Sequence, residues 1–279
     1  MGFFKTLFTG KEDTPEEKAQ EKQRNDFDMF KYDSIQALHM RQTDFAIACL
    51  NHALDIHDDA ETRQHLANAY LANDDIDNAI DQLKRLINLQ PDNPAFAISL
   101  AELQYQREQY EEAQETCREA IGHFATLAQP HHILAKISQA HDDLIQAVAE
   151  ATIAISLQDD LHEAYMLRAA VLGKMGQYQE AETDADKVLA LMPDNDEALT
   201  IKAQCCVATQ RTDEAEQIYR QIINVNPFHA DAYIHLGQLL MKQGRTDEAT
   251  QLAEEALQNV PEQMARINGS FSNMQEETD

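Results

Sequence analysis

The sequence contains no tryptophan, and glycine and proline are scarce, at 8 and 7 of 279 residues. All-β sandwiches and barrels need many Gly- and Pro-rich turns, so this scarcity disfavours them and favours helices. Cysteine occurs four times, and no two cysteines have the Cys-x-x-Cys spacing of zinc and redox motifs. We therefore expect buried, reduced thiols, which favours a cytoplasmic location.

Basic side chains are also few. The chain has 22 Lys and Arg against 49 Asp and Glu, for a formal net charge of −27. The imbalance lies in the body of the chain, because residues 27–261 carry 39 acidic and 16 basic side chains. Such a charge repels phosphate backbones, so nucleic acid is not an expected partner.

No apolar run approaches the roughly 20 residues that a membrane span requires. Residues 1–13 form a short apolar tag and linker, too short for the core of a signal peptide, which again favours the cytoplasm. Phe3, Phe4, Leu7 and Phe8 can share one helical face. Three interpretations stay open: the tag folds back onto the protein, docks on a partner or a membrane surface, or is disordered.

What the sequence does contain is a regular spacing of alanine residues. Alanine recurs every 34 residues at Ala79, Ala113, Ala147, Ala181, Ala215 and Ala249, and Ala46 precedes the first by 33 residues. A fixed period of this size marks a repeat architecture, and a recurring small residue indicates a close helix–helix contact. The period predicts seven repeats within residues 27–261, which start near residues 27, 60, 94, 128, 162, 196 and 230.

Each repeat contains two amphipathic segments of about a dozen residues, which predicts a helix–turn–helix. Proline follows the second segment in four repeats, at Pro91, Pro193, Pro227 and Pro261. Before the array, Thr14 and Glu17 form a capping-box pattern that begins a helix running to about Met40. Residues 14–26 of this helix are a charged extension. We expect a short capping turn and a disordered tail over residues 262–279.

The repeats resemble the tetratricopeptide repeat family. The last repeat carries its pattern most fully, with the signature residues Tyr233, Leu236, Gly237, Ala249, Ala256 and Pro261. This resemblance implies an all-α fold, in which stacked helix–turn–helix units form a right-handed superhelix.

No set of residues predicts catalysis. Four histidines cluster at His123, His131, His132 and His141, but without the spacing of a zinc site. The cysteines lie within repeat helices, and no glycine-rich phosphate loop occurs. We therefore predict a protein that is not an enzyme, with no catalytic residue, metal ligand or cofactor.

The resemblance also implies where a partner binds, because family members usually hold a peptide against the first helix of each repeat. The positions that face such a groove have nearly balanced charge. A clamp of Lys and Asn for acidic chaperone tails is present only in fragments. The predicted groove is lined by Lys31, Gln64, Asn68, Glu102, Tyr105, His132, Lys136, Gln139, Met166, Lys174, Thr200, Gln204, Ile234, Gln238 and Met241.

The predicted function is thus a non-catalytic adaptor or scaffold that binds a peptide or helical segment of another protein in this groove. One alternative is a structural element that assembles with itself through the N-terminal tag or the terminal repeats. Another is a regulatory subunit of an enzyme complex. The identity of the partner and the oligomeric state stay open, and membrane contact is expected only through the tag.

Overall fold

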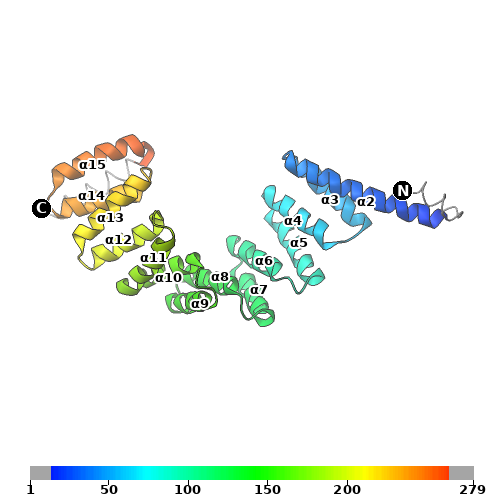
Figure 1. Ribbon diagram of the computed structural model, residues 1–279, viewed down its shortest axis with the longest axis horizontal. Helices are drawn as coiled ribbons and strands as arrows, with labels where there is room; N and C mark the ends of the chain where they lie inside the picture. The colour runs from blue at the N-terminus through cyan, green and yellow to red at the C-terminus, as the bar shows by residue number, and fades with distance from the viewer. Residues whose placement is uncertain (1–13, 264–279) are drawn as a thin grey trace. The chain divides into compact units, whose positions relative to one another are not determined.

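A computed structural model describes residues 14–263, and all regular structure in that range is helical. The predicted all-α fold is therefore confirmed. Helices alternate along the chain as the first and second members of consecutive pairs (Figure 1). The first helices are α2 (Pro15–His39), α4 (Ala60–Ala72), α6 (Pro94–Gln106), α8 (Ala128–Ala140), α10 (His162–Lys174), α12 (Asp196–Ala208) and α14 (Ala230–Lys242). The second helices are α3 (Thr43–Ile56), α5 (Ile76–Leu89), α7 (Tyr110–His123), α9 (Leu144–Leu157), α11 (Tyr178–Leu191), α13 (Thr212–Val225) and α15 (Thr246–Asn259), followed by the short 3₁₀ helix η1 (Pro261–Gln263).

From α4 onward, each first helix begins at a residue that the 34-residue spacing marks as the start of a repeat. The long helix α2 begins with the predicted capping box: the Thr14 hydroxyl accepts from the backbone N–H of Glu17, and the Glu17 carboxylate accepts from the backbone N–H of Thr14. This exchange satisfies donors that would otherwise lack a partner at the helix start. None of the described helices combines the length and apolar character that a membrane span requires.

The turn inside each helix pair is the same throughout the described chain. One residue per turn has a positive φ, and the following N–H donates to a carbonyl five residues back, as in the Schellman motif. Only two of these residues are glycines, Gly176 and Gly244. The others are Arg41, Asp74, Glu108, Asp142 and Gln210. The recurring turn ends each first helix where the second can pack back against it.

The alanines of the repeat pattern are buried, as predicted for contact positions. Ala46, Ala79, Ala113, Ala147, Ala181 and Ala215 are fully buried, and Ala249 is 2% exposed. Interiors are close-packed, so a small residue here lets helix backbones approach closely.

The chain divides into an N-terminal unit (Met1–Ala125) and a C-terminal unit (Thr126–Asp279). In the N-terminal unit, α2 to α7 bury small apolar clusters between consecutive helices, such as Leu50 with Leu66 and Leu86 with Phe96. In the C-terminal unit, α8 to α15 do the same, and the largest cluster includes Tyr219, Tyr233 and Leu240. The core in each unit is therefore shared between neighbouring repeats, as a repeat architecture requires.

Candidate functional site

The predicted groove residues lie on the first helices, and most of them are accessible. Gln64, Asn68, Lys174 and Gln204 are exposed. Ile234 is buried within the C-terminal core, and the others are half-buried. The residues of the proposed docking tag, Phe3, Phe4, Leu7 and Phe8, lie outside the described residues.

One of the predicted groove residues, Lys31, is bound by other side chains of the N-terminal unit. Its Nζ donates to Glu61 Oε2 at 2.7 Å and lies 5.5 Å from the centroid of the Phe27 ring. Lys31 therefore links α2 to α4, and a partner would have to compete with Glu61 for it.

The C-terminal unit has a pocket of about 340 Å³ on the side of its first helices. Gln204, Val207 and Ala208 come from α12, Tyr219 comes from α13, and His235, Gln238, Leu239 and Lys242 come from α14. The structure thus brings together two predicted residues from successive repeats, Gln204 and Gln238. Pockets that bind ligands commonly combine apolar walls with a few polar groups, and this one has both.

An aromatic side chain lies beneath this pocket. Tyr219 is 1% exposed, and its ring centroid lies 5.7 Å from that of His235. Burial raises the pKa of the Tyr219 hydroxyl, so it stays neutral at neutral pH. This side of the pocket is therefore uncharged and suited to an apolar side chain.

Three residues that line this pocket were not among the predicted groove residues, although the repeat spacing could have found them. Val207 stands 34 residues before the predicted Met241. Ala208 and Lys242 stand 34 and 68 residues after the predicted Lys174. His235 is different, because it is the sixth residue of its repeat and no predicted groove residue occupies that position in any repeat.

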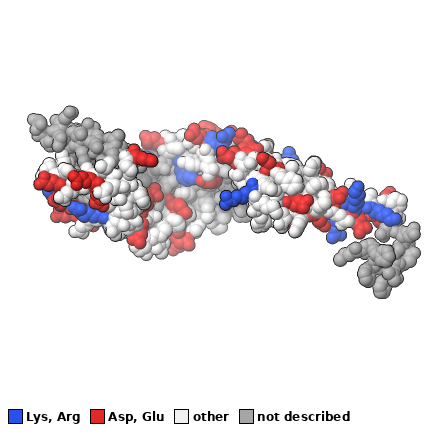
Figure 2. Space-filling view, turned by 90° about the horizontal axis from the view of Figure 1, so that it is seen from above, with Lys and Arg blue, Asp and Glu red and all other residues white. Residues whose placement is uncertain are grey.

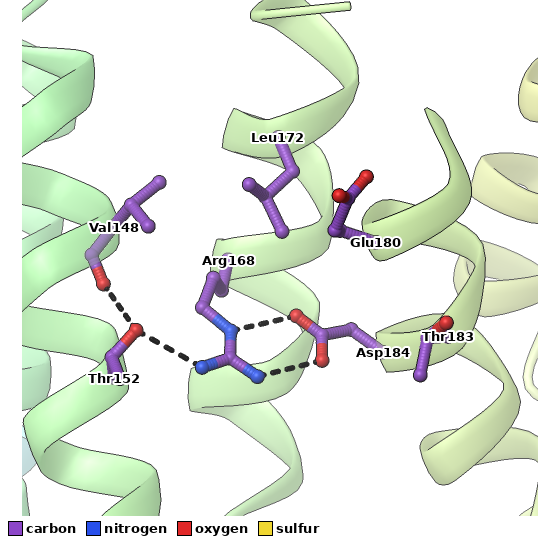
Figure 3. Close-up of a pocket in the computed structure, with 7 residues that line it drawn as sticks. All are labelled: Val148, Thr152, Arg168, Leu172, Glu180, Thr183 and Asp184. Carbon is purple, nitrogen blue, oxygen red and sulfur yellow. Dashed lines mark hydrogen bonds and ion pairs between the residues drawn. The ribbon is translucent and has the colours of Figure 1, made fainter. Parts of the chain in front are cut away.

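A second pocket of about 340 Å³ lies between α9, α10 and α11 (Figure 3). Asp184 accepts two hydrogen bonds from the Arg168 guanidinium, each 2.8 Å long, and Thr152 Oγ1 accepts a third at 3.0 Å. The side chain of Asp184 is only 5% exposed and that of Arg168 only 19%. Val148 and Leu172 form apolar walls, and Glu180 and Thr183 complete the lining.

Arg168 was not predicted as a functional residue, but the sequence contains a signal for it. It occupies the position at which four other repeats have leucine: Leu66, Leu100, Leu134 and Leu236. The hydrogen bonds to Asp184 raise the pKa of the Arg168 guanidinium above its ordinary value, so the pair is ionic. A charged pair therefore replaces part of the apolar packing in this repeat.

One cluster has the composition of a metal site. Ligand atoms of Glu182, Cys206 and Glu214 lie within 4.8 Å of one another. However, the Arg211 guanidinium donates to both oxygens of Glu182 and to Glu214, so a cationic side chain already balances these carboxylates. Burial raises the pKa of Cys206 to about 11, so this thiol is protonated at neutral pH and is a weak ligand and nucleophile.

Charge is distributed unequally between the two sets of helices in the C-terminal unit. Its first helices carry five basic and four acidic side chains, whereas its second helices carry two basic and twelve acidic ones. Figure 2 shows acidic side chains spread over the visible face rather than gathered in one patch. The pocket that contains Gln204 and Gln238 thus lies on the nearly neutral set of helices.

Comparisons with known proteins point to a single family. One tetratricopeptide repeat model matches residues 70–137 and 174–232, and another matches residues 210–263, so the matches cover more than half of the chain. No curated protein sequence matches the chain significantly.

Solved structures with the same fold are distant in sequence. A tetratricopeptide repeat protein from Parabacteroides merdae ATCC 43184 is 18% identical, with 78% of this chain and 87% of that chain covered and a TM-score of 0.63. PilW, described as a widely conserved type IV pilus biogenesis factor, is 18% identical over 72% and 94%, with a TM-score of 0.62. YrrB, described as having an unusual peptide-binding site, is 17% identical over 67% and 96%, with a TM-score of 0.57. At these identities the likeness shows the fold alone.

Proposed function

Because the chain belongs to the tetratricopeptide repeat family, we propose that it is a non-catalytic adaptor that binds a peptide or helical segment of a partner protein against its first helices. The family fold is typical of protein–protein interaction, and the solved relatives include a protein described as having a peptide-binding site. The buried cysteines Cys49, Cys117, Cys205 and Cys206 are consistent with a cytoplasmic location, which we include in the proposal.

The observation that carries this proposal is the pocket between α12 and α14. Gln204 and Gln238 offer amide donors and acceptors above the uncharged Tyr219, and Val207 adds an exposed apolar surface. An extended peptide needs this combination, because its backbone requires hydrogen-bond partners while its side chains require apolar contacts. Because the first helices are nearly neutral, they suit a peptide that combines polar and apolar side chains better than a strongly charged one.

The chain offers a matched pair of residues for a test. Val207 on α12 is 38% exposed, and Val225 at the end of α13 is 39% exposed. Arg at position 207 would place a long charged side chain in the pocket, whereas Arg at position 225 would lie on a second helix. The full chain and the variants Val207→Arg and Val225→Arg would each be immobilised and exposed to native lysate, and bound proteins would be quantified by mass spectrometry.

We expect Val207→Arg to reduce capture of the main partner about tenfold or more, as for a residue at the centre of an interface. Val225→Arg should capture it as the wild type does. Equal capture by all three proteins would place the binding site elsewhere, and equal loss in both variants would indicate a general effect of the added charge.

A further inference from the structure

The pocket between α9, α10 and α11 has a carboxylate in its lining that no described residue binds. Helix α11 carries four acidic side chains, at positions 180, 182, 184 and 186. Three of them bind a cationic side chain from a neighbouring segment: Glu182 binds Arg211, Asp184 binds Arg168, and Asp186 binds Lys202. The fourth, Glu180, is exposed and makes no hydrogen bond or ion pair with any residue between 14 and 263.

We infer that this pocket is a second binding site, which accepts a lysine side chain of a partner protein. Val148 and Leu172 would contact the aliphatic stem, and Glu180 would bind the ammonium group (Figure 3). Lysine commonly buries its methylene stem along an apolar surface while its charged end stays near water. A pocket with apolar walls and an exposed carboxylate matches both parts of that side chain.

The charges around the pocket favour a cation over an anion. Arg168 and Asp184 neutralise each other at the base of the pocket, which leaves the charge of Glu180 unbalanced. An anionic group would meet two carboxylates and only one guanidinium that is already engaged. The second helices of this unit add to the preference, because their twelve acidic and two basic side chains attract positively charged segments.

This site differs from the proposed peptide site, because it lies between α9, α10 and α11 and shares no lining residue with the pocket of Gln204 and Gln238. A partner could therefore use one site without the other, and failure of one proposal leaves the other intact.

The test uses small probes and the full chain labelled at its methyl groups. N-acetyl-lysine N-methylamide would be titrated at millimolar concentrations, and binding would be read from the NMR signals of the Val148 and Leu172 methyl groups. N-acetyl-norleucine N-methylamide has a similar aliphatic stem without the charge, and the corresponding glutamate derivative has the opposite charge. We expect the lysine probe to bind about fivefold more tightly than the norleucine probe, a difference typical of a favourable exposed ion pair.

Two variants complete the test. Glu180→Gln should abolish the difference between the lysine and norleucine probes. Glu112→Gln should preserve it, because Glu112 occupies the same position two repeats earlier and is also exposed. Equal binding of lysine and norleucine by the wild type, tighter binding of the glutamate probe, or no effect of Glu180→Gln would each overturn the inference. Circular dichroism of both variants would verify that they are folded.

Discussion

The first and second helices of the C-terminal unit use polar side chains in different ways. On the second helices, Glu182, Asp184 and Asp186 all bind Arg or Lys side chains from neighbouring segments. On the first helices, Gln204 and Gln238 line an open pocket and are uncharged. The acidic set of helices therefore holds the repeats together through ion pairs, and the nearly neutral set presents polar groups to a partner.

The ion pairs themselves follow the repeat. Arg211 binds Glu182 of the preceding second helix and Glu214 of its own. One period later, Arg245 binds Glu216 and Glu248 in the same arrangement. The arginine and both of its glutamate partners thus recur after 34 residues. The pocket of Gln204 and Gln238, in contrast, combines residues that differ from repeat to repeat. Regular positions build the scaffold, and irregular positions are left for recognition.

The largest effect is expected from breaking the buried pair of Arg168 and Asp184. Asp184→Ala leaves the largely buried guanidinium without its counter-ion and should destabilise the C-terminal unit by about 3 kcal/mol. Urea unfolding followed by circular dichroism would measure this as a lower midpoint. Midpoints are the appropriate comparison, because repeat arrays need not unfold in one step.

The last repeat supplies the control for this variant. Leu236 and Leu252 occupy the positions of Arg168 and Asp184 two repeats later, and both are buried. The double variant Arg168→Leu, Asp184→Leu should recover most of the lost stability, because an apolar pair replaces a buried ion pair at little cost. A double variant as unstable as Asp184→Ala would show that the pair is required for more than charge balance.

A smaller loss of stability is expected from enlarging an alanine at the close contact between first and second helices. Ala181 is fully buried, so Ala181→Leu forces three additional carbon atoms into a close-packed contact and should cost roughly 2 kcal/mol of stability. Ala190→Leu, at an exposed position of the same helix, should leave the midpoint nearly unchanged. Thermal unfolding of both variants would measure the difference, and a shared midpoint would mean that Ala181 is not a close contact.

The sequence predicted the scaffold far better than the sites. The 34-residue spacing locates the helix pairs, because every repeat must present the same small residue at the same contact. Val207 and Lys242 could also have been predicted, since they share repeat positions with Met241 and Lys174. The pair of Arg168 and Asp184 could not, because the spacing predicts an apolar residue at 168 and does not show which side chain approaches it. Only the packing of α10 against α11 brings the two together.

Acid should weaken the ion pairs of the second helices. The hydrogen bonds from Arg245, followed by those from Arg220, hold the pKa of Glu216 below its usual range. A carboxyl whose pKa is lowered on folding stabilises the folded state above its unfolded pKa and loses that contribution as the pH falls through the folded value. The free energy of unfolding should therefore decrease as the pH drops below about 4.5. Glu216→Gln should be less stable by roughly 1 kcal/mol at pH 7 and show a shallower loss in acid.

The matched control for this pH experiment is Glu180→Gln, because Glu180 is exposed and binds no other residue between 14 and 263. Its urea midpoint should keep the steep acid dependence of the wild type between pH 7 and pH 3. If Glu216→Gln keeps that dependence as well, other carboxylates are responsible for acid unfolding.

The smallest effect should come from the residues that line the peptide pocket. Gln204 is exposed and Gln238 is half-buried, and neither side chain makes a hydrogen bond with another described residue. The variants Gln204→Ala and Gln238→Ala should therefore change the free energy of unfolding by no more than about 0.5 kcal/mol each. Their urea midpoints should stay close to that of the wild type, in contrast to Asp184→Ala. A large loss in either variant would mean that the amides of the pocket also stabilise the fold, and the contrast between them and the ion pairs of the second helices would not hold.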